Sequence, residues 1–186
     1  GAIMQWLRDE LGLIKTAAES GELAATIDST DGVYLVPAFT GLGAPYWRPN
    51  VRAAFVGMTR NTSRAHLVRA SLEAVAYRTL DVLLAMQQEG VKLPAVIRVD
   101  GGMSADNWFL QFLADMLQVT IQRAACIETT DLGVAFMVGL QQGVFSDFSA
   151  LEKLWQHDRE FTPKLSIKKR DELYKGWQRA VGVLLT

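Results

Sequence analysis

The tripeptide Asp100-Gly101-Gly102 lies where an apolar run, residues 96–99, gives way to a segment with helical spacing. Because glycine has no Cβ, the backbone of such a turn can lie directly against a ligand. A helix that begins near Ser104 would point its free N–H groups and the positive end of its dipole at the same place. These residue types at this spacing could therefore bind a ligand close to the backbone, at a place that favours negative charge.

The same tripeptide has a simpler explanation, because a Gly-Gly pair between a strand and a helix often serves only as a tight turn. On the residues alone both interpretations stay open. No G-x-G-x-x-G follows a strand and no G-x-x-x-x-G-K-[ST] occurs, so neither a Rossmann dinucleotide site nor a Walker-type loop is indicated. No Cys and His residues have zinc-ligand spacing, and we expect no metal site in this chain.

The elements that position this turn follow from the spacing of apolar residues. Strands are expected at 32–39, 53–58, 96–99 and 119–124, and helices at 3–14, 63–88, 104–117, 132–143, 149–156 and 169–185. Ser63 and Ser104 are expected to cap their helices. The apolar positions of the long helix fall on one face, formed by Val68, Leu72, Val75, Thr79, Leu83 and Met86.

Strands that alternate with helices predict an α/β domain with a partly parallel sheet. In such sheets ligands bind beyond the carboxyl ends of the strands, which is where residues 100–102 lie. No repeat or linker divides the 186 residues, so a single domain is expected.

Composition excludes several classes of function. Nineteen basic and twenty acidic residues give a net charge of −1, so we expect no nucleic-acid partner. The longest apolar run, residues 132–140, is too short to span a membrane, and we expect no membrane partner. The single cysteine, Cys126, favours a reducing, cytoplasmic compartment and is expected to be an inert structural residue. The N-terminus lacks an initiator Met and a signal-peptide pattern, and reads as the middle of a longer protein.

Several segments resemble the FGGY family of carbohydrate kinases. Residues 36–47, VPAFTGLGAPYW, are similar to a segment of its glycerol kinase branch, and residues 98–117 and 128–140 are similar to its nucleotide-side loop and helix and to its E-x-T-A-L-G-A-A segment. The resemblance extends to residues 5–14 and 159–165 and covers essentially the whole chain. The family's second signature is matched at Ala53, Phe55, Gly57, Met58, His66, Leu67, Ala70, Ser71, Leu72 and Glu73.

The resemblance implies an actin-like ATPase, ribonuclease-H-like fold: two α/β domains with ATP in the cleft between them. Residues 1–186 would form the C-terminal, nucleotide-side domain, a mixed sheet flanked by helices, with the N-terminal domain absent. In the family the catalytic base, the glycerol-binding groups and the first phosphate loop belong to the N-terminal domain, so no catalytic residue is expected here. The implied nucleotide-binding residues are Gly1, Gln5, Gly101, Gly102 and Asp106.

The pair of motifs FTGLGAPYW and GMTR favours glycerol kinase over xylulose or gluconate kinases. The implied full-length enzyme uses ATP and magnesium to convert glycerol to glycerol 3-phosphate, with glycerol held through the missing domain, and is a cytoplasmic homo-oligomer. This fragment alone would be inactive. Two alternatives stay open: another FGGY sugar kinase, similar to xylulokinase, and a non-catalytic module that binds a nucleotide or a protein.

The sequence departs from the family pattern at two positions. Asp106 stands where Asn is common, which would place a negative charge near a polyphosphate ligand. Asp131 stands where the family has Ala and is expected to cap the helix that starts near Leu132. In addition, Lys169 occupies the position at which some bacterial members bind a regulatory phosphotransfer protein through an acidic residue, so that contact and any shared zinc are not expected.

Other polar and aromatic residues also have alternative roles. Glu73 is one helical turn from Arg69 and Tyr77, so a structural pair is favoured over catalysis. Asp100 could bind a magnesium-bound water or cap its own loop. For Tyr46 and Trp47, packing against a neighbouring domain or subunit is favoured over substrate contact. Trp108, Phe109 and Phe112 are expected to be core residues.

Overall fold

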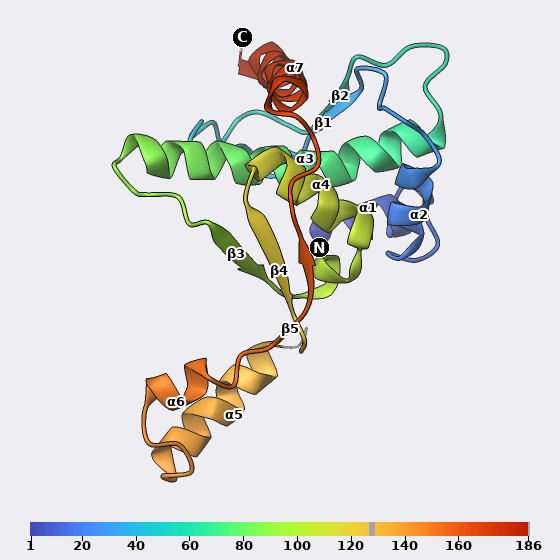
Figure 1. The fold of residues 1–186 in the computed structure, drawn as a ribbon. Coiled ribbons are helices and arrows are strands. Elements are labelled where there is room, and N and C mark those ends of the chain that lie inside the picture. The colour runs from blue at the N-terminus through green and yellow to red at the C-terminus, as the bar shows by residue number, and fades with distance from the viewer. Residues whose placement is uncertain (127–128, 186) are drawn as a thin grey trace.

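The structure is a computed structural model that describes residues 1–126 and 129–185 (Figure 1). Its elements in chain order are α1 (Ala2–Asp9), α2 (Glu19–Ala25), β1 (Tyr34–Val36), β2 (Ala54–Val56), α3 (Arg64–Gln88), β3 (Val96–Val99), the 3₁₀ helix η1 (Gly102–Ala105), α4 (Asn107–Leu117), β4 (Thr120–Ala124), α5 (Thr129–Gln141), α6 (Phe148–Glu152), β5 (His157–Phe161) and α7 (Ile167–Leu185). None of the helices in this part of the chain is long and apolar enough to cross a membrane.

The main sheet has the strand order β3-β4-β5 and is mixed. β3 and β4 run parallel, with Val96 opposite Thr120 and Val99 opposite Arg123, whereas β5 runs antiparallel to β4. β1 and β2 form a separate antiparallel pair. The predicted α/β class and partly parallel sheet are confirmed, and the predicted strand at 96–99 has the observed bounds.

One α-helix and one strand, α2 and β5, were missed by the periodicity. β5 is exposed at every position except Phe161, so its sequence HDREF shows no alternation of apolar and polar residues. The helix predicted at 149–156 is shorter in the structure, because α6 ends at Glu152. α2 is only seven residues long and contains Ser20 and Gly21, which are weak helix formers.

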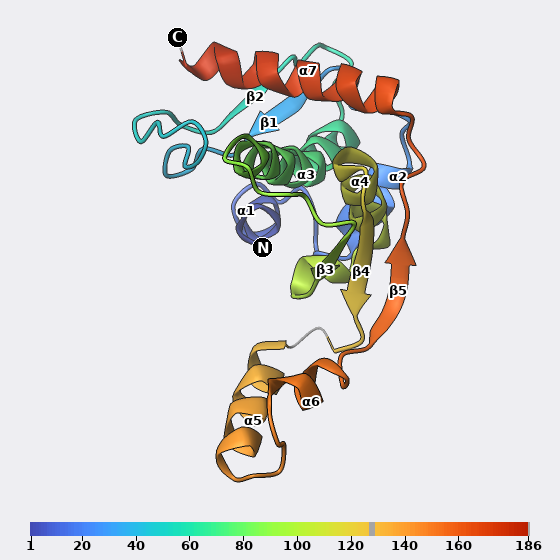
Figure 2. The same ribbon diagram turned by 60° about the vertical axis from the view of Figure 1, so that its left-hand side comes forward.

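Helix α3 lies at the centre of the molecule. It packs against α1, α2, α4 and β1, and Figure 2 shows α7 and the β1–β2 pair on one side of it and the β3–β4–β5 sheet on the other. The predicted apolar face is not the only buried one: Met86 at its end is exposed, while Ala70, Glu73 and Tyr77 are buried on other sides of the helix. A helix that is covered by other elements on all sides has no solvent-facing side, so its central part needs no polar face.

A buried carboxylate connects α3 with α7. Asp81, 2% exposed, accepts hydrogen bonds from the Tyr174 hydroxyl at 2.7 Å, the Trp177 indole N–H at 3.0 Å and Arg78 Nη1 at 3.1 Å. Burial, together with the hydrogen bond to Asp81, raises the pKa of Tyr174. Arg78 Nη2 also donates to the Ala44 carbonyl at 2.8 Å, so the same cluster holds the loop after β1.

Helices α5 and α6 project from the end of the sheet as an arm, residues 129–152 (Figures 1 and 2). Asp131 lies within the first turn of α5, which starts at Thr129. The expectation that Asp131 caps a helix beginning near Leu132 is therefore wrong. The arm exposes the apolar side chains of Leu132, Val134, Met137, Val138, Val144 and Phe148.

We expect Asp81→Ala to lower the free energy of unfolding by about 3–5 kcal/mol, because it leaves Arg78 without its buried partner and removes the acceptor of Tyr174 and Trp177. Chemical denaturation measures the loss. Glu172→Ala, which removes an exposed carboxylate of α7, is the control and should change stability by less than about 0.5 kcal/mol. Equal stability of the two variants would contradict the importance of the Asp81 cluster.

Candidate functional site

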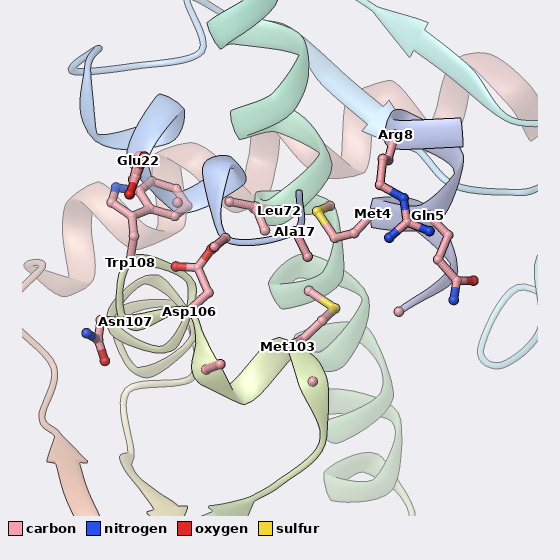
Figure 3. A pocket seen from close by; sticks show the side chains of 15 residues that line it. Met4, Gln5, Arg8, Ala17, Glu22, Leu72, Met103, Asp106, Asn107 and Trp108 are labelled. Carbon is pink, nitrogen blue, oxygen red and sulfur yellow. The ribbon is translucent and has the colours of Figure 1, made fainter. Parts of the chain in front are cut away.

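A cavity of about 620 Å³ lies between the N-terminal helices and the segment that follows β3 (Figure 3). This volume is in the range of small-molecule sites. Met4 and Met103 project toward one another from α1 and η1. The lining residues are Gly1, Met4, Gln5 and Arg8; Ala17, Ala18, Gly21 and Glu22; Leu72; and Gly102, Met103, Ala105, Asp106, Asn107 and Trp108.

Four of the five residues assigned from the family resemblance line this one cavity. Gly1 and Gln5 come from the N-terminus and α1, whereas Gly102 and Asp106 come from η1 and its junction with α4. Gly101 precedes η1 and does not appear among the lining residues. The structure thus brings together residues about 100 positions apart in the chain, and their role in binding stays a prediction.

The two glycines of the turn differ in conformation. Gly101 has φ +79°, a backbone conformation that residues with a side chain rarely adopt. Gly102 lies outside that region, and a Cβ placed on it would meet nothing within 4 Å. Gly101 therefore makes the turn, and Gly102 leaves room at the cavity wall. The tight-turn interpretation of the Gly-Gly pair therefore fits Gly101, and the interpretation that the pair makes room for a ligand fits Gly102.

Helix α4 starts later than predicted, and Ser104 is not its cap. Ser104 is buried and its hydroxyl donates to the Gly101 carbonyl at 2.7 Å, within the η1 turn. Asp106 is the N-cap, and its carboxylate accepts the Phe109 N–H at 3.0 Å. Ser and Asp are both strong N-cap residues, so two candidates two positions apart could not be separated from the sequence.

Asp106 also contacts α2, an element that the sequence did not reveal. A Cβ added to Gly21 would lie 2.7 Å from the carboxyl carbon of Asp106, so only glycine lets α2 come this close. Ser20 Oγ lies 3.4 Å from Asp106 Oδ2. Asp106 thus combines a helix cap with a contact between two walls of the cavity. Gly21 gave no sign of this close packing, because the helix that contains it was not predicted from the sequence.

Arg123 of β4 supports η1 and the start of α4. Its Nη1 donates to the Ser104 carbonyl at 3.1 Å and to Asn107 Oδ1 at 3.0 Å. Nε and Nη2 hold Asp158 at 2.8 and 2.7 Å, and this hydrogen bonding lowers the pKa of Asp158. Sequence reasoning missed Arg123, because its partners are distant in the chain and it lies in an ordinary strand pattern.

Glu73 forms the predicted structural pair. It is 2% exposed and accepts hydrogen bonds from Arg69 Nε at 2.8 Å and from the Tyr77 hydroxyl at 2.9 Å. Burial raises the pKa of its carboxyl.

Asp100 lies outside the cavity lining and accepts a hydrogen bond from the Thr129 hydroxyl, which connects the turn to α5. Within residues 1–126 and 129–185, no three His, Cys, Asp or Glu side chains are grouped to hold a metal ion.

The aromatic predictions hold in part. Phe109 and Phe112 are buried as predicted, whereas Trp108 is half-buried and lines the cavity. Tyr46 packs within its own domain, with the Arg78 guanidinium carbon 5.3 Å from its ring centroid. Trp47 is 71% exposed.

A family model for the FGGY family of carbohydrate kinases, C-terminal domain, matches residues 1–141. The chain therefore belongs to the FGGY family of carbohydrate kinases. It is 54% identical over 186 residues to glycerol kinase of Coxiella burnetii (strain Dugway 5J108-111), covering 100% of this chain and 37% of that protein. It is 49% identical over 181 residues to glycerol kinase of Rhodospirillum centenum (strain ATCC 51521 / SW), covering 97% of this chain and 36% of that protein.

Solved structures agree with this membership. Plasmodium falciparum glycerol kinase with ADP matches with a TM-score of 0.87 and 33% identity, over 100% of this chain and 37% of that one. A ligand-bound xylulose kinase from Lactobacillus acidophilus matches with a TM-score of 0.75 and 24% identity, over 94% and 35%, and shows the shared fold. The predicted actin-like α/β fold is confirmed. The chain spans little more than a third of the length of the relatives it matches.

We expect Asp106→Ala to lower the free energy of unfolding by about 1 kcal/mol, because the Phe109 N–H loses its capping acceptor. Asp106→Asn keeps a capping oxygen and should change stability by only a few tenths of a kcal/mol. Urea denaturation of both variants measures the difference. A loss as large for Asn as for Ala would mean that the charge of Asp106, and not its capping bond, stabilises the fold.

Proposed function

We propose that this chain is the nucleotide-side, C-terminal domain of an ATP-dependent glycerol kinase. The full-length enzyme would transfer the γ-phosphoryl group of ATP to a terminal hydroxyl of glycerol and release glycerol 3-phosphate. The observation that carries the proposal is the cavity at which Gly1, Gln5, Gly102 and Asp106 meet. The 54% identity to a glycerol kinase supports the choice of glycerol over another sugar or polyol.

The charges around the cavity suit the base and ribose of the nucleotide better than its phosphates. Glu22 and Asp106 are acidic lining residues, and Arg8 is a basic one. Arg8 is already paired with Asp9 through two hydrogen bonds of 2.6 and 2.9 Å. Carboxylates repel a polyphosphate, so we place the nucleoside in the cavity and the phosphates directed out of it. The Gly101-Gly102 turn then lies beside the nucleotide.

The remaining catalytic parts are proposed to lie outside this chain. Phosphoryl transfer needs a base, a metal ion and charge stabilisation positioned together. Because the described residues offer no group of metal ligands, we assign magnesium to no residue of this domain. The base and the glycerol-binding groups belong, on the family resemblance, to an N-terminal domain. The homo-oligomer and the cytoplasmic location implied by the resemblance stay predictions. The exposed side chain of Trp47 supports a contact with a neighbouring domain or subunit.

Two other functions stay in competition. Another FGGY sugar kinase would share this fold, as the xylulose kinase match shows. A panel of polyols and sugars, assayed with the full-length protein, separates these substrates. A module that only binds a nucleotide or a protein would show no turnover with any of them.

We expect residues 1–186 alone to show no glycerol phosphorylation, and the full-length protein to phosphorylate glycerol with ATP and magnesium. The physical reason is that half of a cleft cannot bring base, acceptor and phosphate together. A coupled assay that follows ADP release measures both proteins. Turnover by residues 1–186 that survives repurification, or a full-length protein inactive on glycerol, would contradict the proposal.

We expect Gly102→Val to weaken ADP binding to the full-length protein about tenfold, or 1.4 kcal/mol, because its side chain would enter the cavity. Its melting temperature should barely change, since the added Cβ meets no atom of the protein. Gly101→Val is the matched comparison and should destabilise the fold by about 1–3 kcal/mol through its positive φ. Calorimetry with ADP and thermal unfolding measure the two effects. Unchanged ADP affinity in Gly102→Val would show that this glycine provides no room for the nucleotide.

A further inference from the structure

Arg69 of α3 does not line the 620 Å³ cavity, but it contacts its own helix, the end of α2 and α4. Its side chain is 13% exposed, and its Nε donates to Glu73 Oε1 at 2.8 Å within α3. Nη1 donates to the carbonyl of Ile27 and, at 3.4 Å, to that of Ala24. The guanidinium carbon lies 5.0 Å from the ring centroid of Trp108 in α4.

The contacts with Ala24 and Ile27 hold the end of α2. The last carbonyls of a helix have no intrahelical donor, and an arginine can supply one. At its other end, α2 is held against α4 by the close approach of Gly21 to Asp106. α2 is therefore fixed relative to α4 at two places, of which Arg69 provides the second.

α2 and the start of α4 are also walls of the candidate nucleotide cavity. Gly21 and Glu22 line it from α2, and Asn107 and Trp108 line it from α4. Arg69 lines a different cavity, of about 430 Å³, which shares Trp108 with the first. Trp108 also stacks against Phe112, with ring centroids 5.4 Å apart and planes at 6°.

We propose that Arg69 is a positioning residue for the nucleotide cavity: it sets the separation of α2 and α4 through the carbonyls at the end of α2 and the ring of Trp108, without touching the nucleotide. This proposal rests on the proposed function, because it assumes that the cavity binds a nucleotide. Its consequence is that a change at Arg69 alters nucleotide affinity while every lining residue is retained.

The planar guanidinium is what makes these simultaneous contacts geometrically compatible. A lysine at this position keeps a positive charge for the buried Glu73, so the fold is not left with an unpaired carboxylate. Its single ammonium cannot donate to Glu73, reach the carbonyls of α2 and lie flat over an indole at once. Arg69→Lys therefore separates the positioning contacts from the charge pair.

The test is ADP binding by calorimetry and steady-state kinetics, both with the full-length protein well below its melting temperature. We expect Arg69→Lys to weaken ADP binding and raise the KM for ATP by about fivefold, the change that corresponds to one net hydrogen bond. The KM for glycerol and kcat should stay within about twofold, because no group near the acceptor changes. Arg179→Lys, an exposed arginine of α7, is the control and should change none of these values.

Each outcome decides the proposal. An ADP affinity of Arg69→Lys equal to that of a wild type that binds ADP would overturn it and leave the proposed function standing. A wild type that does not bind ADP would overturn both. A loss of melting temperature and kcat without a change in affinity would show a purely structural role. If Arg69→Lys does not fold, the double variant Arg69→Gln/Glu73→Gln removes both charges together, and the same fall in ADP affinity is required of it.

Discussion

Burying charge on α3 is the constraint on which the rest of the domain depends. Glu73 and Asp81 are each 2% exposed, and a carboxylate removed from water is tolerated only with donors around it. Arg69 and Arg78 supply them from the same helix. Each arginine has further N–H groups, and these reach outward to other elements. The two buried carboxylates need hydrogen-bond donors, and the arginines that supply them also connect the central helix with its surroundings.

These connections differ at the two ends of α3. Toward its N-terminal half, the Arg69 pair reaches α2 and α4, which are walls of the candidate nucleotide cavity. Toward its C-terminal half, the Asp81 cluster reaches α7 and the loop that carries Trp47. One rigid helix therefore spans the distance between a small-molecule site and an exposed aromatic residue. Several of these hydrogen bonds reach carbonyls or side chains far along the chain, which periodicity does not reveal.

The parts of the fold that could be predicted from the sequence are those with strong local patterns. α3 has the expected bounds and β3 is where its apolar run lies, because each is long or apolar enough to be distinctive. β5 and α2 were missed, since one is polar and exposed and the other is short. At the site, the family resemblance named five residues, of which all but Gly101 line one cavity. Gly21 and Arg123 act through partners far along the chain, and no local pattern marks them. The cap of α4 was misplaced because Ser and Asp are both favoured N-cap residues, so the residue type of Ser104 gave no sign that Asp106 would cap instead.

Cys126, two residues after β4, was expected to be an inert structural residue, but it is exposed. It is the one cysteine in the sequence. It stands at the boundary between the sheet and the arm formed by α5 and α6. Within residues 1–186, a thiol-reactive fluorophore would therefore attach only at this boundary, outside the lining of the 620 Å³ cavity, because this sequence holds no second cysteine. The domain in this way carries its own labelling point, from which the orientation of the arm relative to the sheet can be followed in solution.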